Sequence, residues 1–267
     1  MIICADDFGW ADDVNQAIID LVAARRVSAV SCMAVLRHCA REDLKPLLAY
    51  AHDIDVGLHF TVTARFLGGD RFARSLPERP VDFFSALKSC VLRRITPAQA
   101  RDEIAGQYEL FVERVGRRPD FIDGHLHVQQ FPIVAGALIE IVESIPASNR
   151  PYIRNSYIPL AKIRAQGVSF WKSVAISTAG KSFRRRLRAR GLATNGGFAG
   201  IYHYRQWHRY RDFLRLFTTH MESPTGILMV HPGFRESWRR AEFEALRQAT
   251  FSSDVVQRFR KAPHDSP

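Results

Sequence analysis

Residues 2–9 read Ile-Ile-Cys-Ala-Asp-Asp-Phe-Gly, a short apolar run that ends in two adjacent acids. Such a run is typical of a buried strand. Successive strand residues point to opposite faces of a sheet, so Asp6 and Asp7 can share a site only where the strand ends and the chain bends. We expect Phe8 and Gly9 to supply that bend. The alternative is that the two acids form a turn or cap the following helix.

Helical and strand-like patterns alternate along the rest of the chain. We expect helices at residues 13–25, 39–50, 97–115 and 133–145 and further strands at residues 27–35, 54–60, 121–128, 152–158 and 226–230. Residues 63–94 are rich in Gly, Pro and Arg and are expected to form long loops with one short helix. Alternating strands and helices indicate an α/β domain with a mostly parallel sheet.

The composition is that of an ordinary globular protein, with 46% hydrophobic and 24% charged residues in a chain of 267. We expect one domain over residues 1–260 and a disordered polar tail over residues 261–267. The chain has no apolar stretch that could span a bilayer, and two acids close to the start argue against a signal peptide. Four cysteines without C-x-x-C spacing read as reduced thiols. We therefore expect a cytoplasmic location.

Histidines follow two more of the expected strands. His59 comes after three mainly apolar residues, and residues 123–127 read Asp-Gly-His-Leu-His. Alternation along a strand would place Asp123, His125 and His127 on one face, where two imidazoles can chelate a metal. One of the two could instead orient a ligand or touch substrate. Because parallel strands bring their carboxyl ends together, these groups predict a metal site with a free carboxylate beside it.

A further histidine, His231, begins a His-Pro-Gly sequence directly after the last expected strand. Its position predicts that it lies at the same end of the sheet as the other polar groups. An imidazole beside a metal site can donate a proton to a leaving amine, because its pKa suits that task.

These segments together resemble the YdjC/ChbG-like carbohydrate deacetylase family, which includes chitooligosaccharide deacetylases and the hopanoid-associated HpnK group. The matching segments occur in the family's order, at residues 5–9 with Val14-Asn15, 56–59, 123–128 and 231–233. The resemblance covers nearly the whole chain. It implies a distorted (β/α) TIM-like barrel that hydrolyses the N-acetyl group of an amino sugar.

The resemblance also implies a role for each site residue. Asp7, His59 and His125 match the ligands of one divalent metal ion. Asp6 matches the general base, and His231 matches the catalytic acid. The family is associated with magnesium, whereas two imidazoles and one carboxylate are a better site for Zn, Mn, Fe or Co. The identity of the metal therefore stays open at this point.

Three residues are expected to bind substrate. Trp10 stands where a smaller aliphatic residue is usual in the family, and it could stack on a sugar ring or pack in the core. His127 and Arg154 are the other two. The family often has histidines on either side of the central motif, where this chain has Phe121 and Gln129. We expect this difference to alter the outer polar shell and with it the substrate.

Residues 181–190 carry six positive charges. They read either as a solvated helix face or as a contact for anionic lipid headgroups or a phosphate-bearing glycolipid at the inner membrane face. The chain has no recognisable nucleic-acid motif, so no nucleic-acid partner is expected. The expected partner is an N-acetylated sugar, as an oligosaccharide or linked to a lipid. The family is often dimeric, but no interface pattern appears in the sequence.

Two rival interpretations compete with the resemblance. Amidohydrolases also carry an H-x-H motif, but on their first barrel strand. Here only 142 residues follow His125, too few for seven more units of ~30 residues each. The second rival is a non-catalytic protein with a vestigial metal site that binds polyanions or anionic membranes. It rests on the net charge of +11.

Overall fold

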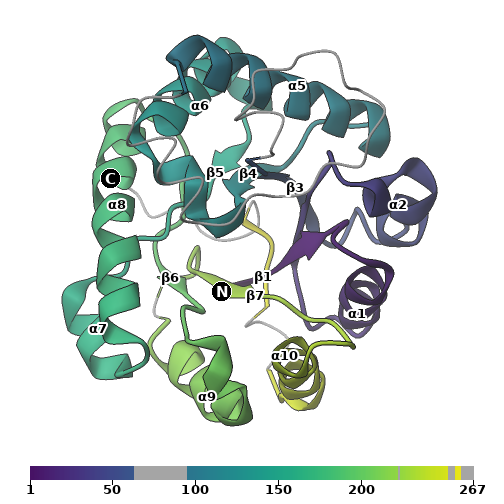
Figure 1. The fold of residues 1–267 in the computed structure, drawn as a ribbon, viewed down its shortest axis with the longest axis vertical. Helices are drawn as coiled ribbons and strands as arrows, with labels where there is room; N and C mark the ends of the chain where they lie inside the picture. The colour runs from purple at the N-terminus through teal and green to yellow at the C-terminus, as the bar shows by residue number, and fades with distance from the viewer. Residues whose placement is uncertain (63–94, 222, 252–255, 260–267) are drawn as a thin grey trace.

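The computed structural model describes residues 1–62, 95–221, 223–251 and 256–259, and Figure 1 shows its fold. The described part contains seven strands, β1 Ile2–Phe8, β2 Ala29–Cys32, β3 Asp55–Phe60, β4 Phe121–Gly124, β5 Tyr152–Ile153, β6 Phe198–Ala199 and β7 Ile227–Val230. They form one parallel sheet in the order β5-β4-β3-β2-β1-β7-β6. The predicted parallel sheet is confirmed.

Helices surround the curled sheet on its outside (Figure 1). The α-helices are α1 Asp12–Ala23, α2 Arg41–Leu48, α5 Pro97–Val115, α6 Pro132–Ser144, α7 Leu160–Gln166, α8 Phe170–Ala189, α9 Tyr210–Thr219 and α10 Ser237–Gln248. The 3-10 helices are η1 Arg37–Cys39, η2 His125–Gln130, η3 Ala147–Asn149 and η4 Tyr204–Arg209. An isolated parallel bridge joins Ile153 of the edge strand β5 to Thr194, in the segment that leads into the other edge strand, β6. The architecture is thus the expected distorted TIM-like barrel.

Successive side chains of β1 point alternately to the two faces of the sheet. Ile3 and Ala5 pack into the cluster formed with the surrounding helices, whereas Ile2 and Cys4 belong to the cluster inside the barrel. Asp6 continues the inward series, and the Cys4 thiol lies 3.4 Å from its Oδ1. The first carboxylate therefore points into the barrel because of its register in β1.

The bend that brings the second carboxylate to the same place occurs at Asp7 itself. Asp7 has a φ of 70°, and the pairing of β1 with β2 shifts register between Ala5 and Phe8. We expected Phe8 and Gly9 to supply the bend, but Phe8 is still part of β1. Gly9 then follows with a φ of 99°, and its N–H donates to Asn15 Oδ1 at 2.6 Å. Such a bulge re-aims a side chain without ending the strand.

The strand predicted over residues 121–128 is wrong in its second half. β4 ends at Gly124, and Leu126 and His127 have φ values of 56° and 60° inside η2. Asp123, His125 and His127 therefore do not share one strand face. Non-glycine residues seldom adopt this left-handed conformation, and the alternation of polar residues in this segment therefore predicts an extended strand.

The other predicted strands and helices differ from the observed ones in length more than in type. β2 and β5 are shorter than predicted, whereas the predicted helix over 97–115 is confirmed as α5. A Thr96 capping box begins this helix, and Gly116, in the left-handed conformation, ends it. The loops predicted over 63–94 and the tail predicted over 261–267 lie outside the described residues. Among the residues described, no helix is both long and apolar enough to cross a membrane.

Gly57 in β3 is required by the packing inside the barrel. A Cβ at this position would lie 2.5 Å from atoms of the Phe121 ring, so the substitution Gly57→Ala would force a strand or the ring to move. We expect Gly57→Ala to lower the free energy of unfolding by about 1–3 kcal/mol in chemical denaturation. Gly106→Ala is the matched control, because no described atom lies within 4 Å of its Cβ, and should add ~0.5–1 kcal/mol. Wild-type stability of Gly57→Ala would contradict this packing.

Candidate active site

A pocket of about 530 Å³ opens at the carboxyl ends of the strands. β1 contributes Asp6 and Asp7, β3 contributes His59, and His125 and His231 directly follow β4 and β7. The structure brings all eight predicted site residues to this one pocket, namely Asp6, Asp7, Trp10, His59, His125, His127, Arg154 and His231. The strand ends therefore meet as the parallel topology predicts.

Asp7, His59 and His125 form a cluster that could hold a metal ion. Their ligand atoms all lie within 4.8 Å of one another. Asp7 Oδ1 is 3.5 Å from His59 Nε2 and 3.1 Å from His125 Nδ1. One carboxylate oxygen and two imidazole nitrogens are a donor set that suits a first-row transition metal. The residues present thus fit the expected divalent ion.

A second layer of polar groups orients these side chains. His59 Nδ1 lies 2.6 Å from Asp123 Oδ1, which also accepts a hydrogen bond from Ser31 Oγ at 2.5 Å. The other ring nitrogen of His59 is thereby directed at Asp7. The second oxygen of Asp7 accepts from Arg239 Nη2 at 2.7 Å. A histidine held by a carboxylate in this way is typical of metal sites.

The same contacts shift the pKa values of two cluster members. Burial lowers the pKa of His59, but the surrounding carboxylates, Asp123 foremost, together raise it to about 10. Burial raises the pKa of Asp7, but the Arg239 guanidinium and the neighbouring histidines hold it well below its usual value. Asp7 is therefore ionised at neutral pH. A metal ion would have to displace a proton from His59, so binding should release protons.

Asp6 pairs with a buried arginine. Arg154 is fully buried, and its Nη1 and Nη2 lie 2.7 Å from Asp6 Oδ1 and Oδ2, respectively. Nη1 also lies 2.9 Å from Asp123 Oδ2. Burial raises the pKa of Asp6, but Arg154, together with His59 and His231, lowers it to about 2. Cys4, Asp6 and Asp123 lie close enough to hold a second ion, but the Arg154 guanidinium already occupies the space among them.

His231 lies between Asp6 and a buried glutamate. Its Nε2 is 3.9 Å from Asp6 Oδ2, and its backbone N–H donates to Glu242 Oε2 at 2.5 Å. Tyr202 donates its hydroxyl to the other Glu242 oxygen at 2.7 Å. Burial lowers the pKa of His231 to about 4 and raises that of Glu242 to about 7. The imidazole is therefore neutral at pH 7 until it receives a proton.

Aromatic rings form the walls above these polar groups. Tyr204 and Trp238 stack with centroids 4.1 Å apart, and each meets the His231 ring edge-on at about 6 Å. Trp10 is 38% exposed, and its ring centre lies 5.8 Å from that of His125. Aliphatic side chains complete the lining, among them Leu126, Ile176, Ile201 and Met229. The pocket is thus polar at its base and apolar around its sides.

His127 occupies a different part of the pocket from His125. Its Nδ1 lies 3.0 Å from Ser156 Oγ, and its ring meets Phe198 edge-on at 5.6 Å. Burial holds the pKa of His127 well below its usual value. It is therefore a neutral polar group in the pocket wall, outside the ligand cluster.

Arg239 and Glu242 are site residues that were missed in the sequence. Both belong to α10 and are buried together with Phe243 and Leu246. The sequence feature that indicates them is a pair of charged residues within the buried stripe of an amphipathic helix, where burying an unpaired charge is costly.

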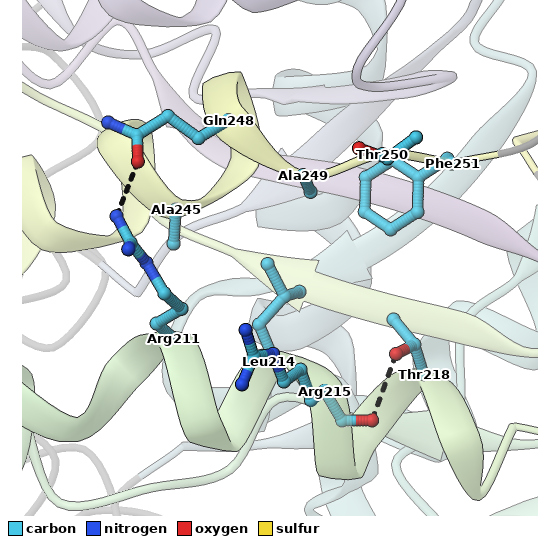
Figure 2. A pocket seen from close by; sticks show the side chains of 9 residues that line it. All are labelled: Arg211, Leu214, Arg215, Thr218, Ala245, Gln248, Ala249, Thr250 and Phe251. Carbon is cyan, nitrogen blue, oxygen red and sulfur yellow. Dashed lines mark hydrogen bonds between the residues drawn. The ribbon is translucent and has the colours of Figure 1, made fainter.

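A second pocket, of about 350 Å³, lies between α9 and α10 (Figure 2). Arg211 donates to Gln248 Oε1 across it, as Figure 2 shows, and Arg215 lies beside them. None of its nine lining residues is a carboxylate, a histidine or a cysteine. The described part of its lining therefore offers no candidate catalytic group.

Known proteins are similar to this chain over most of its length. A carbohydrate deacetylase of Homo sapiens is 27% identical over 254 residues, which are 88% of this chain and 75% of the human protein. A chitooligosaccharide deacetylase of Escherichia fergusonii is 28% identical over 179 residues, 63% of this chain and 67% of that protein. A crystal structure of a candidate cellobiose-phosphate cleavage protein from Enterococcus faecalis V583 shares the fold. Its TM-score is 0.60 at 18% identity, covering 95% of this chain and 91% of that one.

The family described as YdjC-like protein matches residues 1–257. The match spans every element of the barrel and all of the pocket residues discussed above. The resemblance seen in the short motifs is thereby confirmed, and the chain belongs to the YdjC-like protein family.

Proposed function

We propose that this protein is a metal-dependent hydrolase that removes the N-acetyl group from an amino sugar, either in an oligosaccharide or linked to a lipid. The observation that carries the proposal is the Asp6 carboxylate, ionised by Arg154, beside the Asp7, His59 and His125 cluster. The similarity to a carbohydrate deacetylase and a chitooligosaccharide deacetylase supports the reaction class.

Asp7, His59 and His125 would hold one divalent ion. When bound, such an ion polarises the acetyl carbonyl and lowers the pKa of an attacking water from ~15.7 towards ~7. The donor set favours Zn, Mn or Co over the Mg associated with the family. Arg239 and Asp123 keep two of the ligands in place by binding their outer atoms.

Asp6 acts as the general base. Its low pKa keeps it ionised through the neutral range, so it can accept the proton that water loses as it attacks the carbonyl carbon. Arg154 was expected to bind substrate. Since its guanidinium is buried against Asp6 and Asp123, we propose that it orients the base instead.

His231 returns the proton to the leaving group. Its Nε2 lies 3.9 Å from Asp6 Oδ2, a short path for the proton that Asp6 has accepted. The protonated imidazole then donates to the sugar nitrogen as the C–N bond breaks, giving acetate and a free amine. Glu242 Oε1 lies 4.0 Å from Nδ1 of the same ring and would stabilise the imidazolium while it exists.

The walls of the pocket would bind the sugar. Trp10, which is partly exposed and lines the pocket, offers an aromatic ring of the kind on which the apolar face of a pyranose stacks. His127, held neutral, can hydrogen-bond a sugar hydroxyl. The apolar side chains around Met229 would surround the acetyl methyl group.

Glu242 should make the stability of the protein depend on pH. Its pKa is raised from 4.5 to about 7 in the folded protein, so the folded state binds this proton more tightly than the unfolded state does. The resulting stabilisation is complete below pH 4.5 and is lost as the pH rises through about 7, by ~3 kcal/mol in total. Glu242→Gln should lack this loss when both proteins are unfolded with denaturant across that range. Parallel pH profiles would contradict the assignment.

The proposed reaction is tested by acetate release. The chelated protein is reloaded with Mg, Mn, Co or Zn and offered a panel of N-acetylated sugars, including chitobiose and a lipid-linked N-acetylglucosamine. We expect acetate and a primary amine in equal amounts from at least one substrate. No product across the panel, despite stoichiometric metal, would instead favour the non-catalytic alternative.

A further inference from the structure

Positive charge is concentrated in one continuous part of the chain. Residues 144–211 contain 14 Lys and Arg and no Asp or Glu. The remaining 24 Lys and Arg and 27 Asp and Glu give the rest of the chain a net charge of −3. The whole net charge of +11 therefore originates in this segment, which forms β5, α7, α8, β6 and η4.

The two long helical stretches of this segment, α7 and α8, lie on one flank of the barrel. In Figure 1, α7 and α8 lie on the left, whereas α1 and α2 lie on the right. On α8, Lys181, Arg185 and Arg188 are exposed. A one-sided distribution of this kind creates a positive face that attracts a negatively charged surface.

The same segment exposes two indole rings. Trp171, at the start of α8, is 79% exposed, and Trp207, in η4, is 42% exposed. Every residue of η4 is exposed, and Arg205 and Arg209 stand two positions before and after Trp207. Large aromatic side chains exposed to this degree often mark an interaction surface.

The elements that carry these side chains adjoin the candidate active site. Lys172 donates to the Tyr202 carbonyl at 2.9 Å, and its Nζ lies 4.9 Å from the centre of the Tyr204 ring, so the start of α8 adjoins η4. Both Lys172 and Tyr204 line the pocket. Trp171 and Arg205 are their immediate neighbours in the chain. We call Trp171, Arg205, Trp207 and Arg209 the α8–η4 rim.

The chemistry of this rim matches an anionic bilayer. Indole rings partition into the interface between lipid headgroups and acyl chains, and nearby arginines are attracted to anionic headgroups. A deacetylated sugar chain is cationic, so a surface without carboxylates would repel it. A nucleic acid would satisfy the arginines as well, but the chain has no recognisable nucleic-acid motif.

We propose that the α8–η4 rim docks the protein on an anionic membrane surface, with the pocket beside the headgroup layer. This extends the contact predicted for residues 181–190 to the opposite end of the same helix. The proposal rests on charge and exposure and not on the reaction proposed above, so each can fail without the other.

Vesicle co-sedimentation of the full chain tests the proposal. Wild-type protein should bind phosphatidylglycerol-containing vesicles at low salt and bind pure phosphatidylcholine vesicles far less. Arg205→Gln with Arg209→Gln should weaken the binding by about 25-fold, at about fivefold per charge. Trp171→Ser with Trp207→Ser should weaken it by about tenfold or more, and this loss should persist when salt is raised.

The matched control removes the same charge from the other flank. Arg41 and Lys45 are both exposed on α2, and Arg41→Gln with Lys45→Gln should change vesicle binding by less than about twofold. All variants should keep the wild-type unfolding midpoint. Equal weakening by the control pair would show that only net charge matters and would overturn the proposal. Absence of binding to anionic vesicles, or binding to polyuridylate alone, would also overturn it.

Discussion

Replacing Asp6 by Asn is expected to lower kcat by about 10²- to 10⁴-fold while leaving metal affinity nearly unchanged. The reason is that Asp6 contacts Arg154 and lies outside the Asp7, His59 and His125 cluster, so its charge serves proton transfer and not ligation. Acetate release measures the first effect, and metal titration by calorimetry measures the second. Near wild-type turnover by Asp6→Asn would rule out Asp6 as the base.

Cys4→Ala is the matched control for this substitution. Cys4 also points into the barrel, and its thiol lies 3.4 Å from Asp6 Oδ1 and 3.6 Å from Arg154 Nη1. Burial raises its pKa well above the usual value, so it carries no charge. Removing the sulfur disturbs the packing around Asp6 without removing a base, and kcat should fall by no more than a few-fold. A loss as large as that of Asp6→Asn would mean that packing explains both results.

Replacing His125 by Ala is expected to reduce metal affinity by at least about 10²-fold and to bring turnover to background at stoichiometric metal. Loss of a ligand should exceed the 10- to 100-fold typical of groups that only orient ligands. His127→Ala is the matched control, since His127 contacts Ser156 and Phe198 in the same pocket. It should keep its metal affinity and raise KM for the sugar. Equal metal loss in both variants would contradict the proposed ligand set.

The sequence predicts the strand ends well, because short apolar runs followed by polar residues have few other structural solutions. β3 and β7 end at their predicted positions, β1 continues through the two acids to Phe8, and the three strands deliver Asp6, His59 and His231 to one pocket. Helix α5 is predicted fully, since it carries its own capping residues. These features depend on local chemistry, which a single sequence contains.

The parts that were not predicted depend on tertiary contacts. The left-handed backbone at Asp7, Leu126 and His127 is stable only because surrounding strands and loops hold it, and it decides which side chains reach the metal cluster. The buried pair of Asp6 and Arg154 joins residues 148 positions apart, which no local pattern reveals. Helices α7 to α10 carry no short motif of the kind that follows β1, β3 and β4.

The most direct test of the central claim is the rate of deacetylation as metal is titrated into metal-free protein, with an N-acetylated sugar that the panel has identified. One ion bound by Asp7, His59 and His125 predicts a rate that rises linearly to one equivalent of metal per chain and then stays constant. Full turnover by the metal-free protein would contradict the account, and so would a rate that stays at background after one equivalent has bound.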